Sequence, residues 1–430
     1  MAITGCATPY GAPATQAPAS IPLPSAIVAQ ATSAPQTIAL APTTVPTRLA
    51  AAATPVPSPS PLATATPKET LSSIDPTLAA DLQRILDQLV EDGFIPGAVL
   101  AVHIPGQKPW AGASGFIDQQ RTQLMKPTTQ VRIASISKVF TAVIVLQLVE
   151  EGKLDLDAPV STWFPRLVPR ASKTTVRNLL NHTTGLYDYL EDRSFLARAF
   201  QAPDRHWTPE ELVAYAARHP SAFQPGQPGM WDYSSTNYVM LGMIVEQVTG
   251  NSLAHEMRQR ILTPLELRHT FFPPEEAVPG IQARGYRQNH DQTNISLSFA
   301  FATANLVSTV GDVQRFGEAL FGGRLLKPAT LEAMYTFENG KGQYNMPKLE
   351  YGLGVMRNQL AIGRDAHGQA RPALASTVLG HTGGFAGFRS ALWYEPASGI
   401  TIALGMNQGA TDPNILATLV MQAIVDWQGR

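Results

Sequence analysis

The sequence predicts an α+β domain in which one sheet is built from both ends of the chain around a helical middle. Two observations support this fold class. Strand-like apolar segments occur near the start of the globular part, at residues 97–116, and again near the end, at residues 380–408. Between Ser135 and about Phe272, apolar residues instead recur with the spacing of a helix. The helices therefore form an insertion between strands of one sheet.

The first elements of the globular part have clear sequence boundaries. This part begins near Ile74, and a helix is predicted there because Pro76 follows Asp75 and Gly93 lies just past the apolar repeat. Two strands joined by a short polar turn are predicted within residues 97–116.

The remaining elements follow from periodicity and from polar, Gly or Pro stops. A helix that begins at Ser135 continues into the apolar stretch Val139–Val149. Further helical segments are predicted at residues 174–186, 208–220, 236–250 and 252–267, followed by strands within 380–396 and 400–408 and a closing helix at 412–427.

Composition excludes several classes of protein. The 430 residues are 44% hydrophobic and 15% charged, with a net charge of −1 and a pI near 6.8. The chain lacks the excess of basic residues that would indicate nucleic-acid binding. No nucleic-acid partner is therefore expected. The longest apolar runs, such as Val139–Val149, are too short to span a bilayer. The chain is therefore expected to be globular beyond its first residues.

Residues 1–73 differ sharply from the rest of the chain. The first 70 residues hold 13 of the 35 prolines, and Arg48 is the only charged residue before Lys68. Such a segment cannot bury enough apolar surface to offset its ordering entropy. We therefore predict a disordered Pro/Ala/Thr-rich tether at 1–73, followed by one domain at 74–430.

The single cysteine, Cys6, excludes an internal disulfide. Its context, AITGC, resembles the lipobox of bacterial lipoproteins, in which the cysteine is acylated. That resemblance implies a membrane tether through Cys6 and an extracytoplasmic, lipid-anchored or secreted protein of the bacterial envelope. The charged start and the apolar region that normally come before a lipobox are absent. A chance cysteine in a flexible tail is the alternative.

Ser135 and Lys138 lie three positions apart at the start of an apolar helix, so both side chains face the same way. A serine hydroxyl is a poor nucleophile at neutral pH and needs a base. A lysine desolvated among apolar residues loses affinity for its proton and can act as that base. Alone, the pair is weak evidence, and a capping serine with a lysine that extends to solvent is the favoured interpretation.

Other motifs accompany this pair in a fixed order. Tyr233 opens another apolar helix in WDYSSTNYVMLG, His381-Thr382-Gly383 lies in a predicted strand, and LLNHTTGL ends a helix between them. Together the motifs resemble the serine beta-lactamase and penicillin-binding-protein superfamily. The most similar branch is the class C-like group, with its D-alanyl-D-alanine carboxypeptidases and family VIII esterases. The resemblance covers roughly residues 76–430. It implies an antiparallel sheet flanked by helices, with an all-helical subdomain at about 140–290.

The resemblance also implies roles for individual residues. Ser135 is the acylated nucleophile, and Lys138 takes part in its deprotonation. Tyr233 is the general base and acid, as a phenolate stabilised by Lys138, and His381 occupies a strand position where many relatives have lysine. The backbone N–H groups of Ser135 and Gly384 form the oxyanion hole. The residues expected to bind substrate are Ser235, Thr382, Gly383 and Gly384.

Two departures from the family pattern bear on the substrate. Ser235 replaces the usual Asn of the middle motif, and His381 replaces lysine. Both changes weaken the case for efficient beta-lactam hydrolysis, while acyl-enzyme chemistry stays possible. We interpret His182 as a structural residue that orients a turn. Arg389 could contact a substrate carboxylate, but we interpret it as an exposed strand residue. The nine histidines show no metal-binding pattern, so neither a metal nor a cofactor is expected.

The sequence thus predicts a serine hydrolase that acts through an acyl-serine intermediate on a small-molecule or peptide substrate. The first candidate substrate is the D-Ala-D-Ala terminus of peptidoglycan stem peptides, cleaved by a carboxypeptidase. A carboxylic ester and a beta-lactam are the alternatives. A further alternative is an inactive module that binds cell-wall peptides. The oligomeric state is not predicted.

Overall fold

The computed structural model describes residues 71–93, 95–364, 369–371 and 377–429. Most of the predicted tether and Cys6 lie outside the described residues. The chain divides into two units, Met1–Pro67 and Lys68–Arg430. The following description concerns the second unit.

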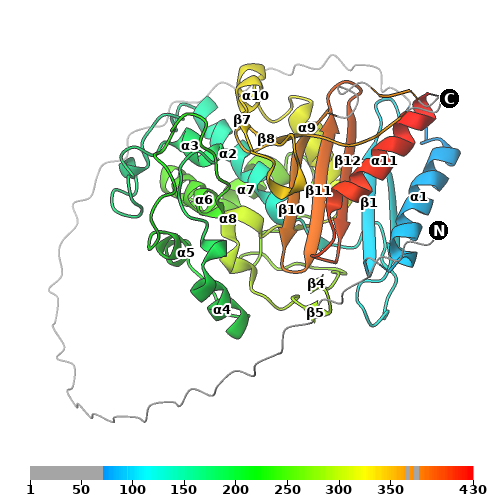
Figure 1. The fold of residues 1–430 in the computed structure, drawn as a ribbon, viewed down its shortest axis with the longest axis horizontal. Helices are drawn as coiled ribbons and strands as arrows, with labels where there is room; N and C mark the ends of the chain where they lie inside the picture. The colour runs from blue at the N-terminus through cyan, green and yellow to red at the C-terminus, as the bar shows by residue number, and fades with distance from the viewer. Residues whose placement is uncertain (1–70, 94, 365–368, 372–376, 430) are drawn as a thin grey trace, which may run out of the picture. The chain divides into compact units, whose positions relative to one another are not determined.

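An eight-stranded antiparallel sheet forms the centre of this unit, with the strand order β2-β1-β12-β11-β10-β9-β8-β7 (Figure 1). Strand β1, from the start of the domain, pairs with β12 from its end, with Ala101 opposite Ala403. This confirms the prediction of a sheet built from both ends. The strands are β1 Gly97–His103, β2 Trp110–Gly115, β7 Glu338–Asn339, β8 Glu350–Tyr351, β9 Met356–Gln359, β10 Thr377–Phe385, β11 Phe388–Glu395 and β12 Ile400–Met406.

Two long helices cover one face of the sheet, α1 (Pro76–Glu91) and α11 (Pro413–Gln428). In Figure 1 they run side by side at the right, in blue and red. Helix α1 begins where predicted, because the Asp75 carboxylate accepts hydrogen bonds from the backbone N–H groups of Thr77 and Leu78. Its leucines Leu78, Leu82, Leu86 and Leu89 lie in the core that both helices share.

The opposite face of the sheet packs against α2 (Ser137–Glu150) and α9 (Val310–Phe321). Helix α2 is apolar on every side, and the ring of Phe140 stacks on Phe316 at 3.6 Å between centroids. A helix that is hydrophobic all round belongs in a protein interior. Its buried position fixes the orientation of the residues at its N-terminus, where the Ser135–Lys138 pair lies.

The helical part of the unit lies beside the sheet, in green in Figure 1. Its helices are α3 Val176–Leu180, α4 Arg193–Gln201, α5 Pro209–Ala216, α6 Ser235–Thr249, α7 Leu253–Met257 and α8 Phe301–Ala304, with a π-helical turn at Arg258–Leu262. A later helix, α10 (Pro328–Met334), is drawn in yellow. Two small two-stranded sheets complete the unit, β3 (Val131–Arg132) with β6 (Val307–Ser308) and β4 (Tyr286–Arg287) with β5 (His290–Asp291).

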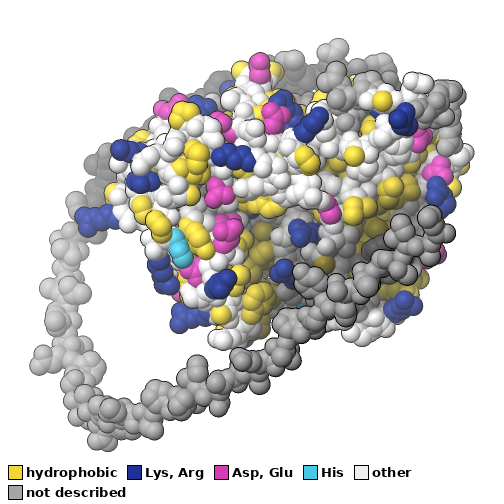
Figure 2. Space-filling model, viewed as in Figure 1, with side chains coloured by type: hydrophobic (Ala, Val, Ile, Leu, Met, Phe, Trp, Pro, Cys, Tyr) yellow, Lys and Arg dark blue, Asp and Glu magenta, His cyan; other side chains and the backbone are white. Residues whose placement is uncertain are grey.

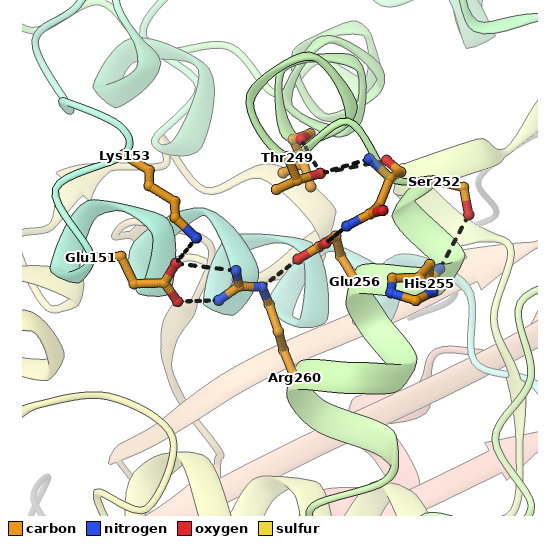
Figure 3. Close-up of polar contacts among 9 residues, drawn as sticks. Glu151, Lys153, Thr249, Ser252, His255, Glu256 and Arg260 are labelled. Carbon is orange, nitrogen blue, oxygen red and sulfur yellow. Dashed lines mark hydrogen bonds and ion pairs between the residues drawn. The ribbon is translucent and has the colours of Figure 1, made fainter. Parts of the chain in front are cut away.

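A network of charged side chains ties the C-terminal end of α2 to α7 and the π-helical turn (Figure 3). The Arg260 guanidinium contacts the carboxylates of both Glu151 and Glu256, and Lys153 lies 2.8 Å from Glu151. The Asn251 amide also donates to Glu256 at 2.7 Å. We call these five residues the Arg260 network. Among the helices that the structure describes, none is both long and apolar enough to cross a membrane.

Candidate active site

Ser135 lies in a tight 3₁₀ turn, Ala134–Ile136, which leads directly into α2. The turn requires Ala134 to adopt a φ of +50°, a left-handed conformation that is uncommon for alanine. The buried hydroxyl of Ser390 on β11 donates to the carbonyl of Ile133 at 2.7 Å. The residue before this turn is therefore anchored to the sheet, and Ser135 itself remains half-buried at the edge of the core.

Gly383 on β10 packs directly against the nucleophile turn. A methyl group at Gly383 would lie 2.5 Å from the carbonyl oxygen of Ile133 and 3.0 Å from the Cβ of Ala134. Only glycine permits this approach, because any side chain at position 383 would clash with the nucleophile turn. This explains why the predicted motif has glycine there. Strand β9 pairs with β10 only as far as Gly380, so in the described part of the chain no strand covers that edge of His381–Phe385. The nucleophile thus lies next to an open strand edge.

Lys138 is 1% exposed, and its Nζ lies 3.3 Å from the Ser135 Oγ and 3.2 Å from the carbonyl oxygen of Thr303. It also lies 4.9 Å from the centre of the Tyr233 ring. Among the described residues, no carboxylate forms an ion pair with it. Burial lowers the pKa of Lys138 to about 7, and the more distant Asp188 carboxylate opposes this shift. A neutral amine can therefore accept the Ser135 proton near neutral pH.

Tyr233 lies on the other side of Lys138, at the segment that leads into α6. Burial raises its pKa well above 10, and a hydrogen bond with Ser135 only partly offsets this shift. The free site therefore contains a neutral phenol, whereas the resemblance implied a phenolate. A neutral Tyr233 can donate a proton but needs to lose its own before it can act as a base.

His381 is fully buried on β10, with its ring centre 6.2 Å from that of Tyr233. Its Nε2 lies 3.0 Å from the hydroxyl of Tyr351, and its Nδ1 contacts the carbonyl oxygen of Thr382. Burial and the nearby Lys138 lower the pKa of His381 to about 3. The imidazole is therefore neutral and carries the Nδ1 proton, and its Nε2 accepts from Tyr351.

His182, which sequence analysis interpreted as structural, connects the LLNHTTGL turn to the start of α6. Its Nδ1 lies 3.1 Å from both the Ser234 backbone nitrogen and the Asn237 Nδ2. Its ring packs on Tyr233 at 4.2 Å between centres. Burial lowers the pKa of His182 well below 6.5, so the ring is neutral. These contacts are consistent with positioning Tyr233 and with no direct chemical role.

The predicted substrate-binding residues are not equally accessible. Gly384 is exposed and Thr382 is half-buried, whereas Gly383 is buried against the nucleophile turn. Ser235 is only 2% exposed, and its backbone N–H donates to the Asp188 carboxylate at 2.9 Å. Gly384 on β10 therefore lies at the open strand edge, whereas Ser235 lies in the interior.

Sequence analysis missed Asp188 and misjudged Arg389. Burial raises the pKa of Asp188, and the carboxylate also accepts from the Leu190 backbone N–H. Its position directly after the LLNHTTGL motif is the one signal that could have identified it. Arg389 was predicted to be exposed but is half-buried, because its Nε donates to the carbonyl of Gly409 at 2.9 Å and its side chain lies over Gly384.

Within the described ranges, no group of three or more His, Cys, Asp or Glu side chains is arranged to hold a metal ion. The arrangement can instead carry out acyl transfer with protein groups alone. It contains a serine hydroxyl, an adjacent amine of lowered pKa and a phenol that forms a hydrogen bond with the serine.

The fold is that of the serine hydrolase superfamily that includes beta-lactamases and penicillin-binding proteins. The chain belongs to the Beta-lactamase family, whose family model matches residues 82–424. It is 28% identical over 283 residues to the putative penicillin-binding protein PbpX of Bacillus subtilis, a match that covers 64% of this chain and 68% of PbpX. It is 34% identical over 232 residues to the esterase EstB of Burkholderia gladioli, covering 49% of this chain and 58% of EstB, less than two thirds of its length.

Solved structures show the same similarity over nearly the whole of the domain. A D-stereospecific amidohydrolase from a Streptomyces species is 33% identical with a TM-score of 0.69. The D-amino acid amidase of Ochrobactrum anthropi, in complex with L-phenylalanine, is 31% identical with a TM-score of 0.71. Each match covers 82% of this chain and 99% of the other chain. The predicted family and fold are thereby confirmed.

Proposed function

We propose that the protein hydrolyses amide bonds next to D-configured residues through an acyl-serine intermediate. The first candidate substrate is the D-Ala-D-Ala terminus of peptidoglycan stem peptides, cleaved as by a carboxypeptidase. The observation that carries this proposal is the Ser135–Lys138 pair, with Nζ 3.3 Å from Oγ and a lysine pKa near 7. The D-specific relatives with solved structures support the choice of D-configured substrates.

The proposed reaction begins with the neutral amine of Lys138. One N–H of the amine donates to the Thr303 carbonyl, which leaves the lone pair free to accept the Ser135 proton. The Ser135 oxygen attacks the substrate carbonyl, and the developing oxyanion is held by the backbone N–H groups of Ser135 and Gly384. The neutral phenol of Tyr233 then protonates the leaving amine. Water hydrolyses the acyl-serine by the reverse sequence of proton transfers.

A second candidate substrate is a carboxylic ester, because EstB shares 34% identity with the matched region. Esters have a better leaving group and depend less on protonation of that group. The predicted envelope location belongs to the same proposal, since the substrate terminus is extracytoplasmic.

A panel of substrates tests the proposed function. Purified protein is incubated with a D-Ala-D-Ala peptide, its L-Ala-L-Ala counterpart, a p-nitrophenyl ester and a cephalosporin. Release of D-alanine from the first peptide alone, absent in Ser135→Ala, supports a D-specific peptidase. Turnover of the ester without either peptide favours the esterase. An absence of turnover of all four would leave the peptide-binding module as the remaining alternative.

A further inference from the structure

The positions of the proton donors determine which way a substrate lies along β10. The leaving group needs a proton, and the groups that can supply it are Lys138 and Tyr233. Tyr233 lies at the His381 side of the open edge, with 6.2 Å between the two ring centres. Gly384, whose N–H is the proposed oxyanion donor, lies three residues further along the strand. The acyl portion of a substrate therefore extends away from Tyr233, toward the turn between β10 and β11.

An arginine with free donors lies at this end of the strand. Arg389 is opposite Gly384 in the pairing of β10 with β11. A methyl group at Gly384 would lie 2.2 Å from an Nη atom of Arg389, so the guanidinium covers the glycine directly. Its Nε donates to the Gly409 carbonyl, and among the described residues its other N–H groups have no hydrogen-bond partner. Gly384 is exposed and Arg389 is half-buried, so the guanidinium is partly accessible from solvent.

A second arginine is held beside the first by the same backbone segment. The N–H of Gly409 donates to the carbonyl of Tyr286 at 2.7 Å, and Arg287 is the next residue of β4. The Tyr286 N–H also donates to the carbonyl of Gly387 in the β10–β11 turn at 3.1 Å. Burial and the charge of Arg287 lower the pKa of Arg389, although Asp412 opposes this shift. Neither arginine forms an ion pair with another described residue, and two neighbouring cations of this kind favour the binding of an anion.

Arg287 also lines a cavity of about 650 Å³ between the end of α4 and the β4–β5 hairpin. Phe200, Pro203, His290 and Asn294 are among the other residues that line it. The carboxylate in its wall, Asp291, is paired with Arg284 at 2.9 Å. Among the described residues Arg287 has no ion-pair partner, so the wall of this cavity carries a cation without a counter-ion.

We propose that Arg389 and Arg287 form a subsite that binds a carboxylate on the acyl portion of the substrate. In a peptide, that group is an acidic side chain on the N-terminal side of the scissile bond. The inference rests on the proposed acyl-serine chemistry and adds a charge preference to it. Guanidinium groups suit this role because they present several N–H donors to one carboxylate.

Two esters with acyl chains of equal length test the subsite. p-Nitrophenyl hydrogen adipate carries a terminal carboxylate, and p-nitrophenyl hexanoate ends in a methyl group. We expect the wild-type kcat/KM for the adipate to exceed that for the hexanoate by about tenfold, through one charge-assisted contact. This ratio should fall toward one in Arg389→Met, chiefly because KM for the adipate rises. In Arg287→Met it should fall only partly. Arg268→Met, which changes an exposed arginine elsewhere, is the matched control and should keep the wild-type ratio.

Three results would overturn the subsite. They are a wild-type ratio near one, an adipate preference that survives in the Arg389→Met/Arg287→Met double variant, and a preference for a carboxylate on the leaving group alone. The last is measured with 3-carboxyphenyl and phenyl hexanoates. Calorimetric binding of the adipate ester to Ser135→Ala, with and without Arg389→Met, tests the subsite without catalysis. Weaker binding after loss of Arg389 supports it even if turnover fails and the proposed function is wrong. Equal binding overturns the subsite alone.

Discussion

Lys138 and the Arg260 network show two ways in which the helices of this protein hold a cation. Arg260 contacts two carboxylates, and these partners raise its pKa. Its partner Glu151 has a pKa lowered to about 2, mainly by the hydrogen bond from Arg260. Lys138 is more deeply buried, and its hydrogen-bond partners among the described residues are a hydroxyl and a carbonyl. Its pKa is lowered to about 7.

The difference separates charges that stabilise the fold from a charge that serves chemistry. A paired, partly exposed cation adds modestly to stability, whereas a buried cation without a counter-ion lowers it. Such a residue persists only if it contributes something other than stability, such as a base that is neutral near pH 7. Substitutions at the two places should therefore have opposite effects on activity and stability.

The largest expected effect is on turnover in Ser135→Ala. Without the nucleophile no acyl-enzyme forms, and kcat should fall by at least roughly 10³-fold on any accepted substrate. Half-burial of Ser135 at the edge of the core implies that the melting temperature changes little. A penicillin or fluorophosphonate should add one covalent mass to the wild-type peptide that contains Ser135. Wild-type turnover in the variant, or a label on another peptide, would contradict the nucleophile assignment.

Lys138→Met should separate activity from stability. Turnover should fall by about 10²–10⁴-fold because the base is lost. Methionine fills a similar volume without a charge, so the melting temperature should stay the same or rise. Steady-state rates and thermal unfolding on the same preparations check both parts. A variant that is both inactive and strongly destabilised would show that the lysine stabilises the fold.

The pH dependence of kcat/KM and of stability should both follow the protonation state of Lys138. Because the amine acts when neutral, kcat/KM should rise with pH along a limb centred near 7. Stability should change in the same direction. The unfolded chain holds this proton up to about pH 10.4, so between about 7 and 10.4 folding becomes more favourable as pH rises. The measurement is the free energy of unfolding across this range in wild type and Lys138→Met. Parallel curves for the two proteins would contradict the lowered pKa.

Much of the site could be predicted because its chemistry is local in sequence. Ser135 and Lys138 lie one helical turn apart, so helical periodicity alone aligns their side chains. The partners that hold them are distant: Thr303 lies 165 residues from Lys138, and Ser390 lies 257 residues from Ile133. No pattern within a sequence window indicates such contacts.

The elements of the fold were likewise predicted only where a pattern is visible in the local sequence. The seven-residue strands β1 and β12 were predicted from their apolar runs, and their pairing confirms the sheet from both ends. Strands β7 and β8 contain two residues each, too few for any alternation to be visible. Helix α9 was also missed, although its buried face packs on the sheet. The placement of Asp188 likewise depends on the Ser235 N–H at the start of α6, 47 residues away.

Arg260→Met tests whether the ion-paired Arg260 network, in contrast to Lys138, stabilises the fold. It removes the cation that joins Glu151 to Glu256, and the Glu256 side chain is only 7% exposed. Loss of a partly buried partner leaves a carboxylate without its counter-ion, so stability should fall by about 1–3 kcal/mol. Turnover of a p-nitrophenyl ester should remain near the wild-type rate, since the network lies outside the candidate site. A loss of activity with an unchanged melting temperature would show that the two regions are coupled.

The smallest effect is expected from Glu151→Gln. Its side chain is 37% exposed, so solvent weakens the pair and the loss at pH 7 should be only about 0.5–1 kcal/mol. The pKa of Glu151 is about 2 in the folded protein against a usual 4.5, so the folded state favours the ionised form. Its contribution is complete above about pH 4.5 and is lost as pH falls toward 2. The difference in unfolding free energy between wild type and variant should therefore shrink over this acid range. The change in stability due to Lys138 is instead expected above pH 7. A difference that stays constant down to pH 3 would mean that Glu151 acts through packing and hydrogen bonding alone, and that its charge does not contribute to the Arg260 network.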